Sequence, residues 1–400
     1  MSALHPIWRN EPAVERLLAA LAAARIEARF VGGCVRDAIL GTTAGDIDVA
    51  TPAEPETVMA ALAAARIKAL PTGLAHGTVT AIVRPRTFEI TTLRRDVETD
   101  GRHAIVAFGA DWAEDAARRD FTINAMYLAP DGTLYDPAGG RADLAARRVR
   151  FVGEPAARIA EDVLRVLRYY RFEARFGAGD GDEAARAACR AAAGQLSILS
   201  AERVWRELSR LIAGSDPVRV LKMMRDDDVL AAILPEATRL DRLERLLPLS
   251  DDPILRLAAL IDTDRAGANA IAERLRLSGT ERGRLASLAA PWPLDPQGDA
   301  RAQRLALYRL GGERYRGLAL LLAADRQVPP PRLAEMQAVA ESWPIPAFPL
   351  GGGDVTALGI APGPRVGRLL GETRRWWEDG DFTADRAACL ARLKSLARQP

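Results

Sequence analysis

Apolar and polar positions divide the chain into two parts with different periodicity. From residue 28 to about residue 140, short apolar runs alternate with turns, as strands of a sheet do. The runs are ARFVGG, DIDVAT, TVTAIV, FEITTL, AIVAF, NAMYLA and TLYD. After about residue 142 the strand signals end, and apolar residues recur at helical spacing. The pattern predicts an α+β fold, with a small mixed-sheet head followed by an all-helical neck, body and tail.

Helical patterns also precede and interrupt the strands of the head. Residues 12–25 place Leu17, Leu18 and Leu21 on one side, and further helices are expected near 54–65 and 112–118. Clusters of proline and glycine punctuate the helical half. We therefore expect five segments: an N-terminal helix packed on the head (1–27), the head (28–141), a neck (142–215), a body (216–290) and a tail (291–400).

Composition narrows the class of protein. Apolar residues make up 48% of the chain and charged residues 27%, which is ordinary for a soluble globular protein. The formal net charge is only +2, so the chain as a whole lacks a basic signature. Lysine occurs only at positions 68, 222 and 394, and the wealth of arginine fits a GC-rich genome as well as phosphate recognition.

Cysteine and histidine usage restricts the compartment and the chemistry. Cys34, Cys189 and Cys389 are odd in number and far apart, which predicts reduced thiols in a cytoplasmic protein. The N-terminal stretch carries charges where a signal peptide needs an apolar run, and no run approaches the ~20 apolar residues of a membrane span. Histidine occurs only at positions 5, 76 and 103, too few for a His-Asp phosphohydrolase site.

The segment Phe30–Thr51 combines features that suit a nucleoside triphosphate. Gly32 and Gly33 carry no Cβ, so the backbone can approach phosphate oxygens. A helix that begins near Cys34 would point free N–H groups at the same place. Arg36 adds a planar cationic fork for phosphate.

Asp46 and Asp48 follow in the same segment. Two apart in a strand, their carboxylates would leave one face roughly 7 Å apart along the backbone. Paired hard oxygen ligands suit Mg²⁺. A Gly-Gly pair alone is a common tight turn, and a lone Asp-x-Asp is common at a strand end. The order and spacing of all these pieces favour the functional interpretation.

Gly-Gly-x-x-Arg-Asp followed by Asp-x-Asp resembles the catalytic head of class II template-independent nucleotidyltransferases, the CCA-adding tRNA nucleotidyltransferases and bacterial poly(A) polymerases. The resemblance covers residues 28–215 well and the remainder loosely. It implies attack of an RNA 3′-hydroxyl on the α-phosphate of a nucleotide. Two Mg²⁺ ions about 4 Å apart would activate the attacking oxygen and neutralise the leaving pyrophosphate.

The resemblance implies roles for several side chains. Asp46 and Asp48 would be catalytic metal ligands, and Glu89 fits a third catalytic carboxylate by alternation and by resemblance, although it could instead pair with Arg94. In the family, an Arg-Arg-Asp motif lies against the sugar and phosphates of the incoming nucleotide. Arginine serves phosphate there, and a carboxylate or amide accepts from a ribose hydroxyl. The matching segment is RRDFTINAM, with Arg119, Asp120 and Asn124 as nucleotide-binding residues.

Residues 161–172, EDVLRVLRYYRF, predict an amphipathic helix. The expected apolar face consists of Val163, Leu164, Val166, Leu167 and Tyr170. The expected opposite sector consists of Asp162, Arg165, Arg168 and Tyr169. Without the resemblance, this sector would be a solvated face with ion pairs between successive turns.

The family reads the nucleotide with Glu-Asp-x-x-Arg on this helix. Asp162 would accept from the exocyclic amino group of cytosine or adenine, and Arg165 would donate to the adjacent ring nitrogen. Uracil and guanine present a carbonyl and a ring N–H there, which would leave buried charges unpaired. Arg168 and Arg171 are further expected phosphate contacts.

Other segments favour tRNA as the substrate. Bacterial poly(A) polymerases carry Gly-Arg-Arg after the Asp-x-Asp strand, whereas residues 72–80 read TGLAHGTVT, as in the CCA-adding branch. The segment SAERVWREL resembles a neck motif of expected structural role, with Ser200 as the helix N-cap. Residues 354–370 resemble the C-terminal segment of such enzymes, where a Gly-Pro turn would touch RNA or only connect helices.

The sequence thus predicts template-independent addition of CCA to tRNA with CTP and ATP, and no DNA or membrane partner. Poly(A) synthesis, or partial addition of CC or of A, remains open, as does the oligomeric state. The intact motif residues disfavour a non-catalytic RNA-binding protein, and the long helical arm disfavours a small-molecule nucleotidyltransferase. We expect RNA binding to follow shape and phosphates and to weaken with salt.

Overall fold

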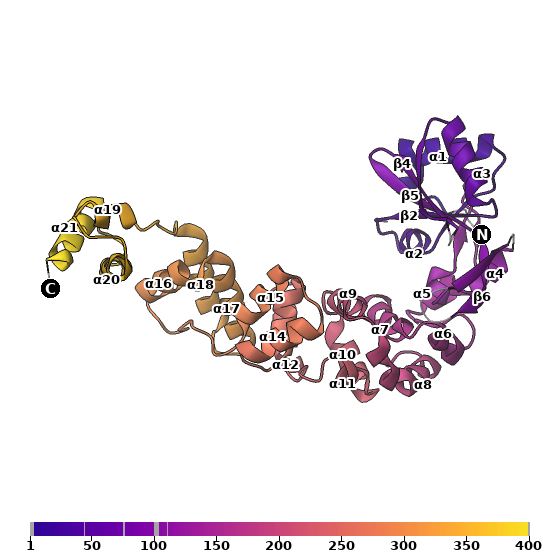
Figure 1. Cartoon of the computed structure of the whole chain (residues 1–400). Helices are drawn as coiled ribbons and strands as arrows, with labels where there is room; N and C mark the ends of the chain where they lie inside the picture. The colour runs from indigo at the N-terminus through magenta and orange to yellow at the C-terminus, as the bar shows by residue number, and fades with distance from the viewer. Residues whose placement is uncertain (1–3, 44, 75–76, 100–103, 110, 399–400) are drawn as a thin grey trace. The chain divides into compact units, whose positions relative to one another are not determined.

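The computed structural model describes residues 4–43, 45–74, 77–99, 104–109 and 111–398, with the backbone alone for 95–99 and 104–107. The chain forms two compact units, Met1–Pro235 and Glu236–Pro400 (Figure 1). Of the segment 72–80 that favoured the CCA-adding branch, residues 75 and 76 lie outside the described ranges. The finer division into five segments stays a prediction.

A seven-stranded mixed sheet forms the head, in the order β3-β4-β5-β2-β1-β8-β9. Its strands are β1 (Arg29–Val31), β2 (Ile47–Thr51), β3 (Lys68–Gly73), β4 (Thr78–Val83), β5 (Arg86–Thr92), β8 (Tyr127–Leu128) and β9 (Leu134–Tyr135). β2 and β5 run parallel, whereas the other neighbours in the sheet are antiparallel. A separate hairpin joins β6 (Arg94–Thr99) to β7 (Ala104–Phe108). The predicted α+β class is confirmed.

Two of these strands, β3 and β6, were not predicted. β3 reads KALPTG and is mostly exposed at the edge of the sheet, so it lacks the apolar alternation that reveals a half-buried strand. β6 reads RRDVET, in which charged residues dominate. Backbone pairing with a neighbour therefore forms both strands without a hydrophobic signal in the sequence.

Four α-helices accompany the strands of the head: α1 (Pro12–Ala23), α2 (Gly33–Ile39), α3 (Pro55–Ala64) and α4 (Trp112–Ala117). α1 and α3 pack on each other and on β4, while α2 packs on β1 and β2. Leu17, Phe30 and Phe88 are completely buried in the resulting core. The buried ring of Trp8 lies edge-on to Phe30, with ring centres 4.7 Å apart, so the segment before α1 is also anchored.

Helices complete the first unit: α5 (Gly140–Ala145), α6 (Pro155–Glu161), α7 (Leu164–Phe176), α8 (Glu183–Ala192), α9 (Ala201–Ile212), α10 (Pro217–Asp226) and α11 (Val229–Ile233). α7 packs against α9 and α10. The apolar face predicted for residues 163–170 is buried, as expected. Tyr169 was wrongly placed in the polar sector: it is fully buried, because its ring packs among Phe121, Phe151 and Tyr170.

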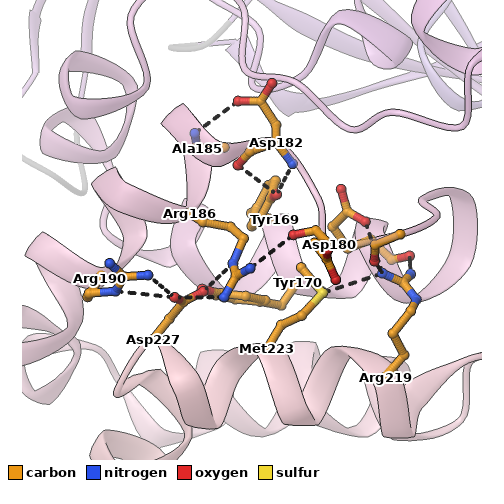
Figure 2. A network of polar contacts seen from close by, with 12 residues as sticks. Tyr169, Tyr170, Asp180, Asp182, Ala185, Arg186, Arg190, Arg219, Met223 and Asp227 are labelled. Atoms are coloured by element: carbon orange, nitrogen blue, oxygen red, sulfur yellow. Dashed lines mark hydrogen bonds and ion pairs between the residues drawn. The ribbon is translucent and has the colours of Figure 1, made fainter.

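A buried polar network ties α7 to α8 and α10, with Asp227 at its centre (Figure 2). The Tyr170 hydroxyl donates to the Asp227 carboxylate over 2.8 Å. Arg186 and Arg190 on α8 donate to the same carboxylate, whose side chain is fully buried. Because every partner sits on a neighbouring helix, Asp227 fixes how α7 lies in the unit.

The second unit is built of helices α12 (Leu240–Leu246), α13 (Pro253–Leu260), α14 (Arg265–Arg274), α15 (Gly279–Leu288), α16 (Ala300–Leu310), α17 (Gly312–Ala324), α18 (Pro330–Ser342), α19 (Gly352–Thr356), α20 (Pro364–Asp379) and α21 (Arg386–Ala397). α17 packs with α12 and α18, and α20 packs with α21 around Trp377 and Leu393. Over the described part of the chain, every helix is too short or too polar to cross a membrane.

We predict that Asp227→Asn destabilises the protein. The change removes the charge that Arg186 and Tyr170 face in a buried setting, so the free energy of unfolding should fall by about 2–3 kcal/mol. Urea unfolding followed by circular dichroism measures the loss. Asp226→Asn is the control, because Asp226 is exposed and pairs with the exposed Arg225. Equal stability of the two variants would contradict this role of Asp227.

Candidate functional site

Two carboxylates face each other across the parallel strands β2 and β5. Asp48 lies directly opposite Glu89 in the register, so both side chains leave the same face of the sheet. Burial raises the pKa of Asp48 to about 6, and the negative charges of Glu89 and Asp46 add to the rise. The positive charge of Arg119 acts in the opposite direction. The strand pair therefore holds a group of like charges together.

Asp46 lies just outside the strand in which it was predicted. β2 begins at Ile47, whose partner Phe88 is the first of the parallel register, and Gly45 and Asp46 form a bend before it. The Asp46 side chain is exposed, yet its charge still acts on Asp48. The direction of the Asp46 side chain is therefore set by the conformation of the preceding loop and not by strand alternation.

Gly32 and Gly33 face two of the predicted arginines. Gly32 precedes α2 with φ of 74°, a left-handed conformation that favours glycine. A Cβ on Gly32 would lie 3.7 Å from Nη1 of Arg119, and one on Gly33 would lie 3.5 Å from Nη2 of Arg36. The backbone at the start of α2 therefore meets two guanidinium groups, close to the carboxylates on which Arg119 acts.

A continuous set of polar contacts joins α2 to α7. Arg36 donates to the Asn124 side-chain oxygen over 2.6 Å and also pairs with Asp37. The Asn124 amide donates to Asp120 over 3.1 Å. Asp120 in turn accepts from Nε of Arg168 over 2.9 Å. Burial opposes ionisation of Asp120, but the charge of Arg168 and these hydrogen bonds keep its pKa below the ordinary value.

Arg119 is held beside this network by its own partners. Its guanidinium pairs with the buried carboxylate of Asp115 at 3.0 Å and donates to the Tyr127 hydroxyl over 3.3 Å. The Tyr127 ring also lies under the guanidinium, with 5.3 Å between the guanidinium carbon and the ring centre. Arg119 is therefore fixed next to Gly32, and its charge acts on Asp48.

The two predicted base-reading residues flank a break between helices. Asp162 was expected within a helix, but it ends α6 with extended backbone, and α7 begins at Leu164. One Asp162 carboxylate oxygen accepts from the Leu164 N–H at 3.1 Å, so Asp162 caps the start of α7. The other oxygen accepts from Arg203 of α9 at 2.7 Å.

Arg165 does not pair with Asp162. Its guanidinium pairs with Glu161 at 2.5 Å and donates to the Arg158 carbonyl over 2.8 Å. Each base-reading candidate is thus held by a separate partner. The charge of Asp162 also acts on Arg168, which places the helix break next to the contacts between α2 and α7.

The segment 200–208 was expected to have a structural role, but it also contributes two contacts with predicted site residues. Ser200 occupies the N-cap position of α9, but its side chain makes no capping hydrogen bond. Arg203 binds Asp162, and the buried Glu207 pairs with Arg171 at 2.5 Å. Arg203 and Glu207 are four residues apart on one helix face, a spacing that could have indicated a shared contact with one neighbouring segment.

The carboxylates of Asp48 on β2 and Glu89 on β5 together have the chemistry of a divalent-cation site. Within the described residues, no three potential metal-ligating side chains already converge on one point. Asp48 and Glu89 nevertheless offer hard oxygen donors. Burial, and after it the negative charges of Glu89 and Asp46, raise the pKa of Asp48, and a bound cation would offset both effects. The donor set therefore fits a divalent cation.

Comparisons with known proteins relate the chain to one group of enzymes. The family described as "Poly A polymerase head domain" matches residues 28–150, and "Probable RNA and SrmB-binding site of polymerase A" matches residues 182–240. The mitochondrial CCA tRNA nucleotidyltransferase 1 of Mus musculus is 34% identical over 396 residues, covering 92% of this chain and 86% of that relative. The CCA-adding enzyme of Anoxybacillus flavithermus is 36% identical over 235 residues, 58% of each chain. The crystal structure of Bacillus stearothermophilus CCA-adding enzyme in complex with CTP matches with a TM-score of 0.80 and 28% identity, over 97% of this chain and 98% of that one.

The raised pKa of Asp48 predicts a pH-dependent effect of Asp48→Asn on stability. The native carboxyl holds its proton up to about pH 6, whereas the ordinary pKa is 3.8, so ionisation of Asp48 destabilises the fold progressively across that range. In EDTA at pH 8 we expect Asp48→Asn to raise the melting temperature by about 2 °C. At pH 3, where Asp48 is protonated in both states, the gain should vanish. An equal gain at both pH values would contradict the assignment.

Proposed function

The chain belongs to the family of class II CCA-adding tRNA nucleotidyltransferases and bacterial poly(A) polymerases, and we propose that it adds CCA to the 3′ end of tRNA. The substrates are CTP and ATP, and no nucleic-acid template is needed. The observation that carries the proposal is the extent of the similarity. A CCA tRNA nucleotidyltransferase aligns with 92% of this chain, which includes the helical arm as well as the head.

We assign catalysis to Asp46, Asp48 and Glu89, with the two aspartates as metal ligands. Enzymes of this family use divalent metal ions, and we propose Mg²⁺. When bound, Mg²⁺ would supply Lewis-acid stabilisation of the attacking 3′-oxygen and the leaving pyrophosphate. The shared register of Asp48 and Glu89 and the charge of Asp46 support the assignment. Asp48 acts in its ionised form, with oxygens directed away from the sheet.

The triphosphate would lie on Gly32 and Gly33, between the guanidinium groups of Arg36 and Arg119. The glycine backbone leaves space for phosphate oxygens, and the arginines neutralise their charge. Release of pyrophosphate from this cradle completes each addition. Asp120 and Asn124 would orient the ribose, since both lie in the polar contacts that connect Arg36 with Arg168.

Asp162 and Arg165 would read the base. Asp162 accepts from the amino group of cytosine or adenine, and Arg165 donates to the neighbouring ring nitrogen. A side chain discriminates between bases only if its orientation is fixed, and here Arg203 holds Asp162 while Glu161 holds Arg165. Arg168 remains a proposed phosphate contact. Arg171 has the weakest support, because its guanidinium already pairs with the buried Glu207.

The second unit would contact tRNA through exposed arginines of its last helices. Arg368 and Arg375 are exposed and seven residues apart on α20, so they share one face. Contacts of this kind bind phosphates without reading sequence and weaken with salt.

We further propose a reducing compartment such as the cytoplasm, because Cys34, Cys189 and Cys389 are all free and buried.

The function is tested with three transcripts: tRNA ending before CCA, tRNA ending in CC, and an unrelated RNA. Each is incubated with Mg²⁺ and labelled CTP or ATP. We expect addition of CCA to the first, of A to the second, and no extension of the third. Long A tracts on any RNA would establish poly(A) synthesis instead, and addition of only CC or only A would establish a partial enzyme.

Asp48→Ala should abolish incorporation of both nucleotides, because it removes the central carboxylate of the site. The loss should exceed about a thousandfold in kcat. The variant must still melt cooperatively, which shows that the loss is not unfolding. Normal incorporation by folded Asp48→Ala would refute the catalytic assignment.

Base selection is tested by competition between CTP and UTP. Arg165→Ala removes one proposed reader, and we expect the preference for CTP to fall by about 100-fold. Arg203→Gln only releases Asp162, so a fall of about tenfold is expected, with a smaller change in the rate of CTP addition. Arg206→Gln, an exposed arginine on the same helix, is the control. Unchanged preference in both test variants would remove Asp162 and Arg165 from base reading.

A further inference from the structure

The loop that leads into Asp46 is tied to the sheet by Arg86. Arg86 is the first residue of β5, and the register that pairs Ile47 with Phe88 places it beside Gly45 when continued backwards. Its Nη1 donates to the Gly45 carbonyl over 3.1 Å. That carbonyl belongs to the peptide bond between Gly45 and Asp46. A restraint on this oxygen therefore acts directly on the backbone that carries Asp46.

The opposite edge of the same guanidinium is clamped by Glu11. Nη2 of Arg86 donates to one Glu11 oxygen over 2.7 Å, and Nε donates to the other. Glu11 is itself anchored, because it directly precedes α1 and its N–H donates to the Trp8 carbonyl over 3.1 Å. Trp8 packs on Phe30 of β1. Arg86 thus connects the Asp46 backbone to the core of the head.

Side-chain packing gives this loop little support. Residues 41–43 and 45 are exposed. A cavity of about 240 Å³ separates the loop from the segment before α1, and its lining includes Trp8, Glu11, Thr42, Thr43 and Arg86. Beyond the hydrogen bonds of Thr42 to the Asp37 carbonyl, a loop beside an open cavity gains little from packing. The position of Gly45 therefore depends on polar ties such as those of Arg86.

Arginine suits this position better than lysine. The guanidinium can hold Glu11 with one edge while another N–H reaches the Gly45 carbonyl. A lysine ammonium would keep a positive charge near Asp46 but could not span both partners in the same geometry. The hydrogen bond with Glu11 and the negative charge of Asp46 both raise the pKa of Arg86, so the side chain stays charged.

We propose that Arg86, held by Glu11, is a positioning residue that sets where the Asp46 carboxylate meets Asp48 and a divalent cation. The inference rests on the proposed function, since it presumes that Asp46 is a metal ligand. It assigns a role in the reaction to a contact between β5 and the segment before α1. Neither residue is assigned a contact with the substrate.

The test compares Arg86→Gln, Arg86→Lys and Glu11→Gln in the full-length protein. Two quantities are measured: the Mg²⁺ concentration for half-maximal CMP addition, and binding of Mn²⁺ followed by electron paramagnetic resonance. Arg86→Gln should raise the Mg²⁺ requirement about tenfold and weaken Mn²⁺ binding to a similar degree, whereas KM for CTP at saturating Mg²⁺ should stay within about twofold. Arg86→Lys and Glu11→Gln should show smaller shifts in the same direction. The double variant that combines Arg86→Gln with Glu11→Gln should resemble Arg86→Gln alone, because Arg86 and Glu11 act through one contact.

Arg274→Gln is the matched control. It breaks a two-bonded ion pair with Glu236 in the other unit and should leave metal dependence unchanged. Unchanged Mg²⁺ dependence and Mn²⁺ binding in Arg86→Gln, with Asp48→Ala inactive, would overturn this inference alone. Normal activity of folded Asp48→Ala would overturn the catalytic assignment as well. If Arg86→Gln fails to fold, the Mg²⁺ requirement and Mn²⁺ binding of Arg86→Lys and Glu11→Gln test the inference instead.

Discussion

The parallel pairing of β2 with β5 is the constraint on which the rest of the site depends. It sets Asp48 and Glu89 side by side on one face of the sheet, with the charge of Asp46 acting on the same place. Like charges brought together in a partly buried setting oppose folding. The sheet tolerates them because its apolar core, which includes Phe30 and Phe88, fixes the register independently. Stability is thereby given up at the place where we propose that a cation binds.

Further polar residues of the candidate site are held near these carboxylates by two kinds of contact. Arg119 is held by Asp115 and Tyr127 within the head, so its charge stands beside Asp48. Arg36, Asn124, Asp120 and Arg168 then continue from the head to α7 through direct hydrogen bonds. α7 is fixed in turn by the buried contacts of Tyr170 with Asp227 (Figure 2). The proposed phosphate-binding residue Arg36 is thus joined by hydrogen bonds to α7, the helix that begins just after Asp162.

Sequence patterns revealed the elements whose formation depends on burial. The apolar runs of β1, β2, β4 and β5 and the buried face of α7 were predicted, because alternation and helical periodicity record which side meets the core. The edge strand β3 and the charged strand β6 were missed, since backbone pairing forms them without such a record.

Contacts that leave no trace in the periodicity of the sequence were also beyond prediction. The break at Asp162 depends on a capping bond to the Leu164 N–H and an ion pair with Arg203, neither of which alters helical periodicity. The tie from Arg86 to Gly45 and Glu11 joins residues 41 and 75 positions apart. Motif order proposes which side chains carry the chemistry, whereas the residues that hold these side chains in place became visible only in the structure.

The most direct test of the account is the position of the metal ion relative to these carboxylates. Crystals of the protein with Mn²⁺ and a non-hydrolysable CTP analogue would locate the metal by its anomalous scattering. We expect a peak about 2.0–2.3 Å from carboxylate oxygens of both Asp46 and Asp48, on the Glu89 face of the sheet. A nucleotide-associated metal bound away from Asp46 and Asp48 would contradict the central claim.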